Sequence, residues 1–232
     1  MQLSRRLEKL IELAGSGACA ADIGTDHALV PIELVRRGAF ERAVAGDLRK
    51  GPLAAASVHV RQAGLTDRIS LRLGDGISVI APGEADVILI SGMGGALMQR
   101  ILTEGREAAS AARKLVLSPQ SEIPEFRSFL QKNGFRITEE AIVYEDRKFY
   151  FLMTAEPGEQ EVWEGADRLY GKTLLEQGGE TIAAYVRRRR SVLGRILRNL
   201  EKAENDKTET RRQEAQEELR LTEEALEKLQ KK

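Results

Sequence analysis

Short apolar runs alternate with helical stretches along most of this chain, and this alternation restricts the fold more than any other feature of the sequence. The apolar runs are "ACAADI", "RAVAGD", "RISLRL", "DVILIS" and "KLVLSP". Between them, apolar residues recur at helical spacing, and glycines such as Gly38, Gly64 and Gly134 follow the helical stretches. Strands that are apolar along nearly their whole length are buried on both faces. The pattern therefore predicts a parallel sheet covered by helices on both sides.

The last part of this pattern departs from simple alternation. Residues 135–156 hold two β-rich runs around a polar "EDRK" turn, which predicts an antiparallel hairpin. A doubly wound α/β sheet that ends in such a hairpin is typical of the seven-stranded, Rossmann-like sheet of class I S-adenosylmethionine-dependent methyltransferases, where the last strand inserts antiparallel. A plain dinucleotide-binding fold ends in parallel strands instead, and the first turn here also lacks G-x-G-x-x-G. An NAD-linked oxidoreductase is therefore a weaker alternative.

The composition changes after Pro157, so we predict a domain over residues 1–157 and a helical domain over residues 158–232. Two charged helical segments follow Glu180, with a break near Asn205–Asp206. Their mostly apolar seam positions alternate spacings of four and three, at Ile182, Val186, Arg189, Leu193, Ile196 and Leu200, and at Ala215, Leu219, Thr222, Leu226 and Leu229. This is heptad spacing over only about three heptads each. It favours an antiparallel, coiled-coil-like pair within one chain, hence a monomer, over a long dimeric coil.

Bulk composition excludes several classes of protein. The single cysteine, Cys19, excludes an internal disulfide framework, and with only two histidines the chain offers no metal constellation. The longest uncharged run, residues 87–98, is shorter than the roughly 20 residues that a membrane helix needs. The N-terminus has no signal-peptide pattern. We therefore expect a soluble, cytoplasmic protein that binds neither a membrane nor a metal.

Acidic residues and glycines mark the ends of four successive predicted strands, where ligands bind in open α/β sheets. Asp22 and Gly24 end the first strand, and Asp47 ends the second, where a carboxylate can accept hydrogen bonds from both ribose hydroxyls. Asp75 and Gly76 end the third, where a carboxylate can accept from an adenine amino group. Singly, Asp47 or Asp75 could instead cap the following helix. Together, the four strand ends indicate a nucleoside-type cofactor.

The fourth strand ends in "SGMGG", with glycines at Gly92, Gly94 and Gly95. Three glycines in four positions indicate that a flat group approaches the backbone there, although a tight strand-to-helix turn is an alternative explanation. Met93 is either part of a pocket or packing filler. The fifth strand is followed by Gln120, whose amide could read the edge of a base.

The sequence segments "ADIGTDHALVPIEL", "GDG" and "SGMGGALM" resemble the bacterial tRNA (adenine-22-N1)-methyltransferase family, the TrmK-like enzymes. The resemblance extends over nearly the whole chain. It implies transfer of the methyl group of S-adenosylmethionine to N1 of an adenosine in the D-arm region of tRNA. One departure is that the family usually has an aromatic residue followed by Leu-Pro after "DHA", whereas this chain has Leu29, Val30 and Pro31. The role of that aromatic residue is therefore vacant or taken by another residue.

The resemblance, together with the strand ends, assigns roles to individual residues. Asp26 is the catalytic candidate, because a carboxylate that accepts a hydrogen bond from the adenine N6 group would orient the base and stabilise its growing positive charge. His27 would position the base or the cofactor carboxylate, unless it only hydrogen-bonds its own loop. The predicted cofactor-binding residues are Asp22, Gly24, Asp47, Leu48, Asp75, Gly76 and Gly92. The predicted substrate-binding residues are Met93, Gly94, Gly95, Gln120, Arg187, Arg188 and Arg190.

The arginine run from Arg187 to Arg190, with Arg195 and Arg198, is the main nucleic-acid signal in the residues themselves. Residues 181–232 carry 14 Lys and Arg against 10 Asp and Glu, although the whole chain has a formal net charge of +0. Arginines that contact phosphates would hold tRNA, whereas the alternative is a solvated helix face paired with nearby glutamates. His59 and Trp163 are predicted to be structural. A small-molecule methyltransferase and a non-catalytic RNA-binding or interaction protein remain the alternative functions.

Overall fold

A computed structural model describes residues 3–201 and 206–231 of the chain. The contacts divide the chain into two compact units, Met1–Glu161 and Val162–Lys232. The composition predicts the division after residue 157, and the contacts place it after Glu161. The two units are described separately below.

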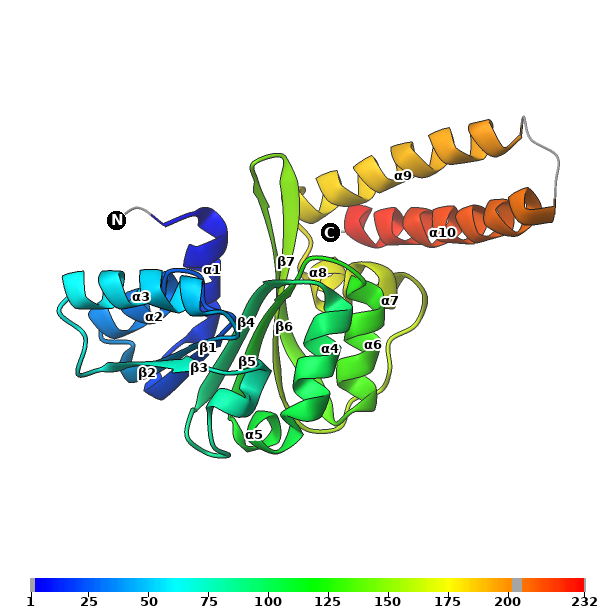
Figure 1. Cartoon of the computed structure of the whole chain (residues 1–232). Coiled ribbons are helices and arrows are strands. Elements are labelled where there is room, and N and C mark those ends of the chain that lie inside the picture. The colour runs from blue at the N-terminus through cyan, green and yellow to red at the C-terminus, as the bar shows by residue number, and fades with distance from the viewer. Residues whose placement is uncertain (1–2, 202–205, 232) are drawn as a thin grey trace. The chain divides into compact units, whose positions relative to one another are not determined.

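The first unit is built on a seven-stranded sheet with the strand order β3-β2-β1-β4-β5-β7-β6 (Figure 1). Its strands are β1 (Gly17–Ile23), β2 (Phe40–Asp47), β3 (Ile69–Leu73), β4 (Val87–Met93), β5 (Lys114–Pro119), β6 (Phe135–Glu145) and β7 (Lys148–Pro157). Strands β1 to β5 pair in parallel, and β7 lies antiparallel between β5 and β6. This confirms the predicted doubly wound, Rossmann-like sheet with an inserted antiparallel strand.

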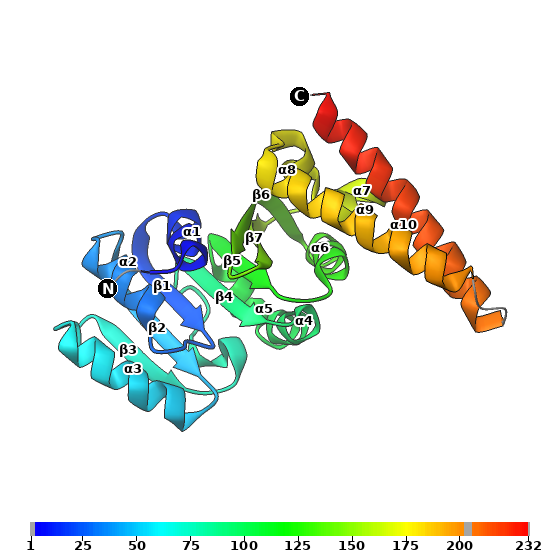
Figure 2. The same ribbon diagram turned by 90° about the horizontal axis from the view of Figure 1, so that it is seen from above.

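Helices cover both faces of this sheet, as the apolar strands predict (Figures 1 and 2). Helices α1 (Arg5–Ala14), α2 (Leu29–Arg36) and α3 (Lys50–Gln62) lie on one face, and α4 (Gly95–Glu104), α5 (Arg106–Ala111) and α6 (Ile123–Lys132) lie on the other. A 3₁₀ turn, η1 (Gly76–Val79), follows β3. The core beneath α1 and α2 joins Leu10 and Leu34 to Val87, Leu89 and Val116 of the sheet. The sequence pattern does not predict α5, which is short and follows α4 directly.

The hairpin turn between β6 and β7 follows from its two central residues. Asp146 and Arg147 both have positive φ angles, of 48° and 63°. Two successive residues of this kind match the twist of a two-residue antiparallel hairpin. The turn therefore closes β6 onto β7 without a long loop, at the position where the "EDRK" segment predicts it. Because β6 runs parallel to β5, this turn lies at the same edge of the sheet as the carboxyl ends of β1 to β5.

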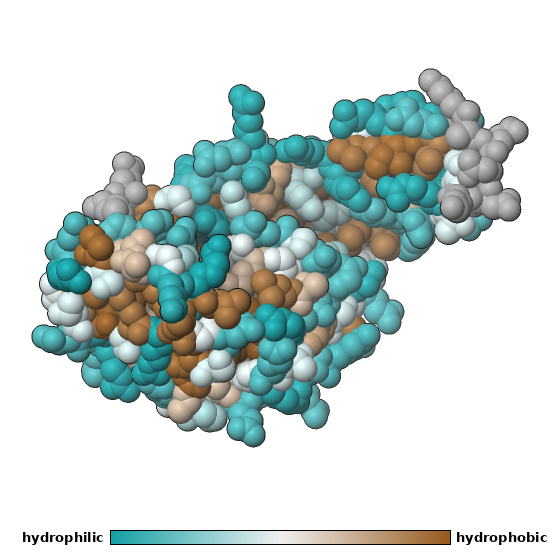
Figure 3. Space-filling view, viewed as in Figure 1, coloured by the Kyte–Doolittle hydropathy of each residue, from teal (hydrophilic) through white to brown (hydrophobic). Residues whose placement is uncertain are grey.

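The second unit is helical, with α7 (Gly165–Tyr170), α8 (Lys172–Gln177), α9 (Glu180–Leu200) and α10 (Asp206–Gln230). Helices α9 and α10 pack along each other and run in opposite directions, which confirms the predicted antiparallel pair. Ile182, Val186 and Leu193 of α9 are buried, as are Ala215 and Leu226 of α10. Figure 3 shows hydrophobic residues as a strip along the pair, between hydrophilic residues. The predicted break at Asn205–Asp206 falls partly outside the described residues, since Asn205 is not described and α10 begins at Asp206.

The seam between α9 and α10 also contains polar contacts. Arg189, at a heptad position, forms two hydrogen bonds with the carboxylate of Glu218, at 2.5 and 2.7 Å. The Tyr170 hydroxyl of α7 lies 2.7 Å from the Thr222 hydroxyl of α10. Trp163 is buried near the start of this unit, as predicted. These contacts tie the long helices to each other and to α7 within one chain.

Candidate active site

The carboxyl ends of the parallel strands line two adjoining cavities in the first unit, with volumes of about 300 and 630 Å³. Gly24, Asp47, Arg49 and Met93 line both cavities. The first cavity lies over β2 and β3, and the second extends toward β5 and the start of α1. This is the edge at which open α/β sheets bind ligands. The strand-end residues that the sequence marks are therefore brought together in space.

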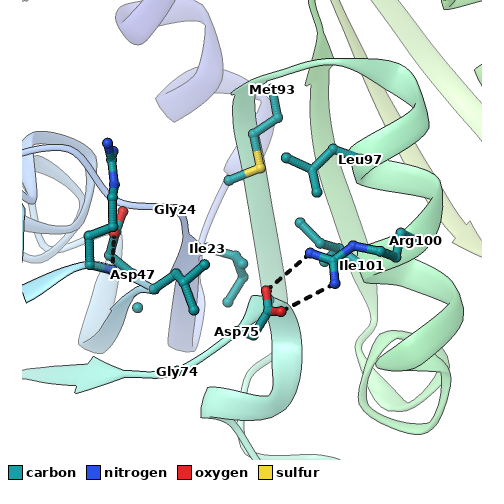
Figure 4. Close-up of a pocket in the computed structure, with 13 residues that line it drawn as sticks. Ile23, Gly24, Asp47, Gly74, Asp75, Met93, Leu97, Arg100 and Ile101 are labelled. Atoms are coloured by element: carbon teal, nitrogen blue, oxygen red, sulfur yellow. Dashed lines mark hydrogen bonds and ion pairs between the residues drawn. The ribbon is translucent and has the colours of Figure 1, made fainter.

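Asp47 and Asp75 are carboxylates of the first cavity, and Figure 4 shows Met93 and Leu97 pointing toward the space near them. Asp47 is buried, and its Oδ1 accepts a hydrogen bond of 2.7 Å from the backbone N–H of Arg49. The alternative of helix capping is not supported for either residue. Neither α3 nor η1 has a side-chain hydrogen bond at its N-cap position. Both carboxylates thus belong to the cavity wall.

Arg100 of α4 holds the carboxylate of Asp75 in a two-point ion pair, which the dashed lines of Figure 4 mark. Its Nη1 lies 3.2 Å from Oδ2, and its Nη2 lies 3.3 Å from Oδ1. The paired arginine fixes the carboxylate at the cavity wall while leaving its remaining lone pairs available as acceptors. The sequence does not predict this role for Arg100, because nothing local in α4 indicates which strand end its side chain reaches.

Two exposed leucines add an apolar surface to the first cavity. Leu48 is 62% exposed and Leu97 is 40% exposed, and both line the cavity. Exposed leucines beside carboxylates suit a ligand with a flat apolar part and polar edges, because binding would remove the apolar surface from water. Leu48 is a predicted cofactor-binding residue, and it lies in this wall.

Gly24 lies between the two cavities and needs to be glycine for two reasons. Its φ is 76°, and a Cβ at this position would lie 1.9 Å from Cε of Met93. The backbone N–H groups of Gly24 and Thr25 both donate to the carbonyl of Gly46, at 2.8 and 2.9 Å. The Met93 side chain therefore packs directly onto the first turn of the fold. Met93 separates the two cavities, and it lines both.

The second cavity is lined by three aspartates, Asp22, Asp26 and Asp47, together with Gly92 and Gln120. Asp22 is buried at the end of β1, and burial raises its pKa to about 6. That value includes an opposing contribution from the nearby Thr25 side chain and a smaller upward contribution from the charge of Asp47. A cation placed against this buried carboxylate would stabilise its ionised form.

Arg6 of α1 contributes a cation to the second cavity, and the sequence does not predict this role. Its guanidinium carbon lies 5.0 Å from the centroid of the Tyr150 ring on β7. Among the described residues, no carboxylate forms an ion pair with the Arg6 side chain. The helical pattern of residues 3–14 indicates only a packing helix, so the approach of its first turn to the cavity depends on tertiary structure.

Asp26 and His27 lie in the loop between β1 and α2. The Asp26 side chain is 83% exposed and lines the second cavity, whereas His27 does not line either cavity. The Nε2 atom of His27 lies 3.3 Å from Oδ1 of Asp26. His27 and Ala28 both have positive φ angles, of 62° and 54°, a conformation that costs roughly 1–2 kcal/mol per residue with a Cβ. His27 is thus placed to orient Asp26 rather than to face a ligand.

His59 is predicted to be structural, and its contact reaches beyond α3. Its Nδ1 lies 3.1 Å from the backbone oxygen of His27. The two imidazole centroids are 5.3 Å apart. Sequence reasoning missed this contact because His59 and His27 lie on separate elements that only the tertiary structure brings together.

Gly94 and Gly95 do not line either cavity. A Cβ on Gly94 would lie 2.8 Å from the Ser121 hydroxyl, and a Cβ on Gly95 would lie 2.6 Å from the Ser121 carbonyl oxygen. Close packing against this loop explains why both positions are glycine. Contact of these two glycines with a base stays a prediction.

Gly92, by contrast, lines the second cavity together with Gln120 and has a φ of 79°. The apolar side chains of Leu29 and Val30 line the same cavity. This cavity therefore combines an apolar wall, an amide and carboxylates, which suits a purine base as well as the polar end of a cofactor.

The predicted arginines of α9 lie in the second unit and differ in their pairing. Arg187 pairs with Glu180 at 2.8 Å, and Arg190 pairs with Glu223 at 3.7 Å. Arg188 is exposed, and the described part of the chain offers it no ion pair. Intrahelical and interhelical glutamates therefore account for part of the run and leave Arg188 facing solvent.

Residues 3–201 and 206–231 also bear on two other kinds of partner, metal ions and membranes. No group of three or more His, Cys, Asp or Glu side chains in these ranges could hold a metal ion. No helix in the same ranges is both long and apolar enough to cross a membrane.

Comparisons with known proteins agree with this geometry. A family model described as "Methyltransferase domain" matches residues 3–153. The tRNA (adenine(22)-N(1))-methyltransferase of Bacillus subtilis is 39% identical to this chain over 161 residues, which cover 69% of this chain and 68% of that protein.

Solved structures extend the similarity to both units. The crystal structure of the Bacillus subtilis m1A22 tRNA methyltransferase TrmK is 31% identical and has a TM-score of 0.89, with 97% of this chain and 99% of that chain covered. A Streptococcus pneumoniae protein in complex with S-adenosyl-L-methionine is also 31% identical, with a TM-score of 0.87, and the match covers 97% of this chain and 100% of that chain.

Proposed function

The chain belongs to the tRNA (adenine(22)-N(1))-methyltransferase family and transfers a methyl group from S-adenosylmethionine to N1 of adenosine 22 in tRNA; we propose that Asp26 is the residue that promotes this transfer. The observation that carries the proposal is the convergence of Asp22, Asp26, Asp47 and Asp75 around two joined cavities at one edge of the sheet. Each carboxylate then has a separate task.

The residues present fit the cofactor along its whole length. Asp47 is placed to accept from the ribose hydroxyls, and Leu48 and Leu97 offer an apolar surface for the adenine ring. Asp75, held by Arg100, is placed to accept from the adenine amino group. In the second cavity, Asp22 suits the ammonium group of the methionine part. Arg6 suits its carboxylate or another anion of the bound substrates.

The bound cofactor supplies an electrophilic methyl group on a sulfonium sulfur. N1 of the target adenine carries a lone pair and no proton, so no residue has to remove a proton before transfer. Positive charge grows on the purine during the reaction. Asp26 accepts a hydrogen bond from the exocyclic N6 group, and its negative charge stabilises the purine more as that charge grows. His27 holds the Asp26 carboxylate at 3.3 Å.

The target base has to leave its stack in tRNA before N1 is accessible, because N1 lies on the Watson–Crick edge. We assign Gln120, Met93 and Leu29 to the wall of the pocket that receives the base, since all three line the second cavity. Leu29 stands where the family pattern has an aromatic residue. An apolar contact from Leu29 therefore replaces ring stacking in this chain.

The reaction is tested with labelled S-adenosylmethionine and unmodified tRNA, followed by nucleoside analysis. We expect 1-methyladenosine as the product. A matched tRNA with guanosine in place of adenosine 22 should accept no label. Labelling of that control tRNA, or a different methylated nucleoside, would contradict the assigned target.

We further propose that the exposed arginines of α9 contact tRNA phosphates. Arg188 and Arg195 are seven residues apart and so share one face of α9, and both are exposed. A double variant, Arg188→Ala and Arg195→Ala, is expected to weaken tRNA binding. It should also reduce the slope of log K against log salt by about 1 to 2, because each lost phosphate contact removes roughly 0.7–0.9.

The control for this measurement removes two arginines of α10, Arg212 and Arg220, which pair with glutamates of their own helix. This second double variant loses the same charge and should keep the wild-type slope. Equal slopes in all three proteins would place the phosphate contacts elsewhere.

The pKa of Asp22 leads to a prediction about cofactor affinity. Only the ionised carboxylate attracts the ammonium group, and the pKa of Asp22 is about 6. The affinity for S-adenosylhomocysteine, which has the same ammonium, should therefore rise by about tenfold between pH 5 and pH 7. Calorimetric titration at several pH values measures this rise, and Asp22→Asn should remove it.

The raised pKa of Asp22 also predicts that its ionised carboxylate, which favours cofactor binding, lowers the stability of the unliganded protein. A carboxyl group whose pKa is raised on folding favours the folded state at low pH, and this contribution is lost as pH rises from about 4 to about 6. Asp22→Asn should therefore stabilise the unliganded protein at pH 7.5 by about 3 kcal/mol, since one pKa unit corresponds to about 1.4 kcal/mol. The exposed Asp67→Asn should change neither property. A loss of both affinity and stability in Asp22→Asn would contradict this account.

We also propose that the protein acts as a monomer in the cytoplasm, where its tRNA substrate is found. Support for the monomer comes from α9 and α10, which pack along each other within one chain and bury the heptad positions Ile182, Val186, Leu193, Ala215, Thr222 and Leu226. Light scattering at micromolar concentration measures the oligomeric state directly.

A further inference from the structure

The two histidines of this chain lie next to each other at the edge of the active site. His59 of α3 places its Nδ1 at 3.1 Å from the backbone oxygen of His27, and the ring centroids are 5.3 Å apart. A carbonyl oxygen only accepts hydrogen bonds, so Nδ1 of His59 must carry the proton and donate it. His59 is therefore bonded to the backbone of the loop that holds Asp26.

The face of α3 that carries His59 also packs against this loop. Ala56, His59 and Val60 lie at positions i, i+3 and i+4 and thus share one side of the helix. Ala56 and Val60 are buried in one cluster with Ala28, the residue that follows His27. The same helix face thus contacts the loop twice, through an apolar contact at Ala28 and through a hydrogen bond at His27.

The loop needs such support because of its backbone. His27 and Ala28 are consecutive residues with a Cβ and with positive φ, a conformation that persists only where the surroundings impose it. Hydrogen bonds to the Gly46 carbonyl hold the loop at Gly24 and Thr25, before the two residues in question. After Asp26, the hydrogen bond from His59 and the packing of Ala28 take over this function.

His27 links this support to Asp26. Its ring lies against His59 on one side, and its Nε2 lies 3.3 Å from the Asp26 carboxylate. Asp26 itself is largely exposed, so few other contacts restrict its side chain. We propose that His59 is a positioning residue for the methyl transfer. It fixes the backbone and ring of His27, and His27 in turn fixes the carboxylate of Asp26 relative to the target base.

This inference rests on the catalytic role proposed for Asp26, and the first experiment measures its effect on turnover. His59→Ala should lower the turnover number by about tenfold or more, because small displacements of a catalytic group are costly. The dissociation constant for S-adenosylhomocysteine and the KM for tRNA should stay within about twofold. His59→Asn, whose amide nitrogen can donate in the place of Nδ1, should restore most of the turnover. Gln62→Ala, an exposed change on the same helix, is the control.

A double-mutant cycle separates positioning from a merely structural role. If His59 acts through Asp26, then the double variant His59→Ala and Asp26→Asn turns over no more slowly than Asp26→Asn alone. Full additivity of the two effects, or full activity of His59→Ala beside a slow Asp26→Asn, would overturn the inference for His59. Full activity of Asp26→Asn would instead overturn the proposed role of Asp26, and with it the positioning role.

Discussion

An Asp26→Asn variant should methylate tRNA at least about 100-fold more slowly than the wild type, because removal of one group that stabilises transition-state charge typically costs 100- to 1000-fold in turnover. Asparagine keeps an oxygen that can accept from the adenine N6 group. The substitution therefore removes the negative charge and retains the shape and the acceptor. Turnover should fall while binding of the base is largely kept, since the purine gains its charge only during transfer.

Three measurements identify this effect as catalytic. The Asp26 side chain is 83% exposed, and its close contact among the described residues is with Nε2 of His27 at 3.3 Å, so the melting temperature should change little. The affinity for S-adenosylhomocysteine should stay within about twofold, because Asp22 and Asp47 remain. The exposed Asp67→Asn controls for the loss of one surface charge. A turnover number within about threefold of wild type would remove Asp26 from the mechanism.

The parts of the site that the sequence predicts are those that depend on local order along the chain. Asp22, Asp47 and Asp75 directly follow apolar strands, and parallel strands place their carboxyl ends at one edge. Periodicity therefore locates these residues before any tertiary contact is known. The antiparallel hairpin is predictable for the same reason, because its turn residues lie between two β-rich runs.

The parts that the sequence does not predict depend on which side chains of a helix reach a distant strand end. Arg6, Arg100 and His59 all lie on helices, and each contacts a residue at least 25 positions away. Helical periodicity indicates which neighbours share a helix face with these residues, but it does not indicate which distant residues that face packs against. Gly94 shows the converse case, because local glycine content does not reveal that the Ser121 loop packs closely against this position.

The second large effect concerns the buried ion pair between α6 and β6, and it should appear in stability rather than in chemistry. Arg127 is 0% exposed and Glu140 is 1% exposed, and Nε lies 2.7 Å from Oε1. The guanidinium also lies 5.6 Å from the ring centroid of Phe151 on β7. Glu140→Gln removes the carboxylate charge from a buried arginine, and breaking such a pair typically costs about 3–5 kcal/mol. The melting temperature should therefore fall by about 10 °C, at roughly 2–4 °C per kcal/mol for a chain of this size.

Two further variants show whether a loss of stability comes from breaking the Arg127–Glu140 ion pair or from any substitution on β6. Glu139→Gln alters the exposed neighbour on β6 and should leave the melting temperature within about 2 °C, as is usual for surface substitutions. The double variant Arg127→Met and Glu140→Leu replaces both charges with apolar groups and should recover most of the stability, because the desolvation cost disappears together with the attraction. A double variant that is less stable than wild type, beside a Glu140→Gln variant that is as stable as wild type, would mean that packing of the arginine against Phe151 holds α6 to the sheet. The two charges would then be dispensable for stability, and the apolar part of the arginine would carry the contact.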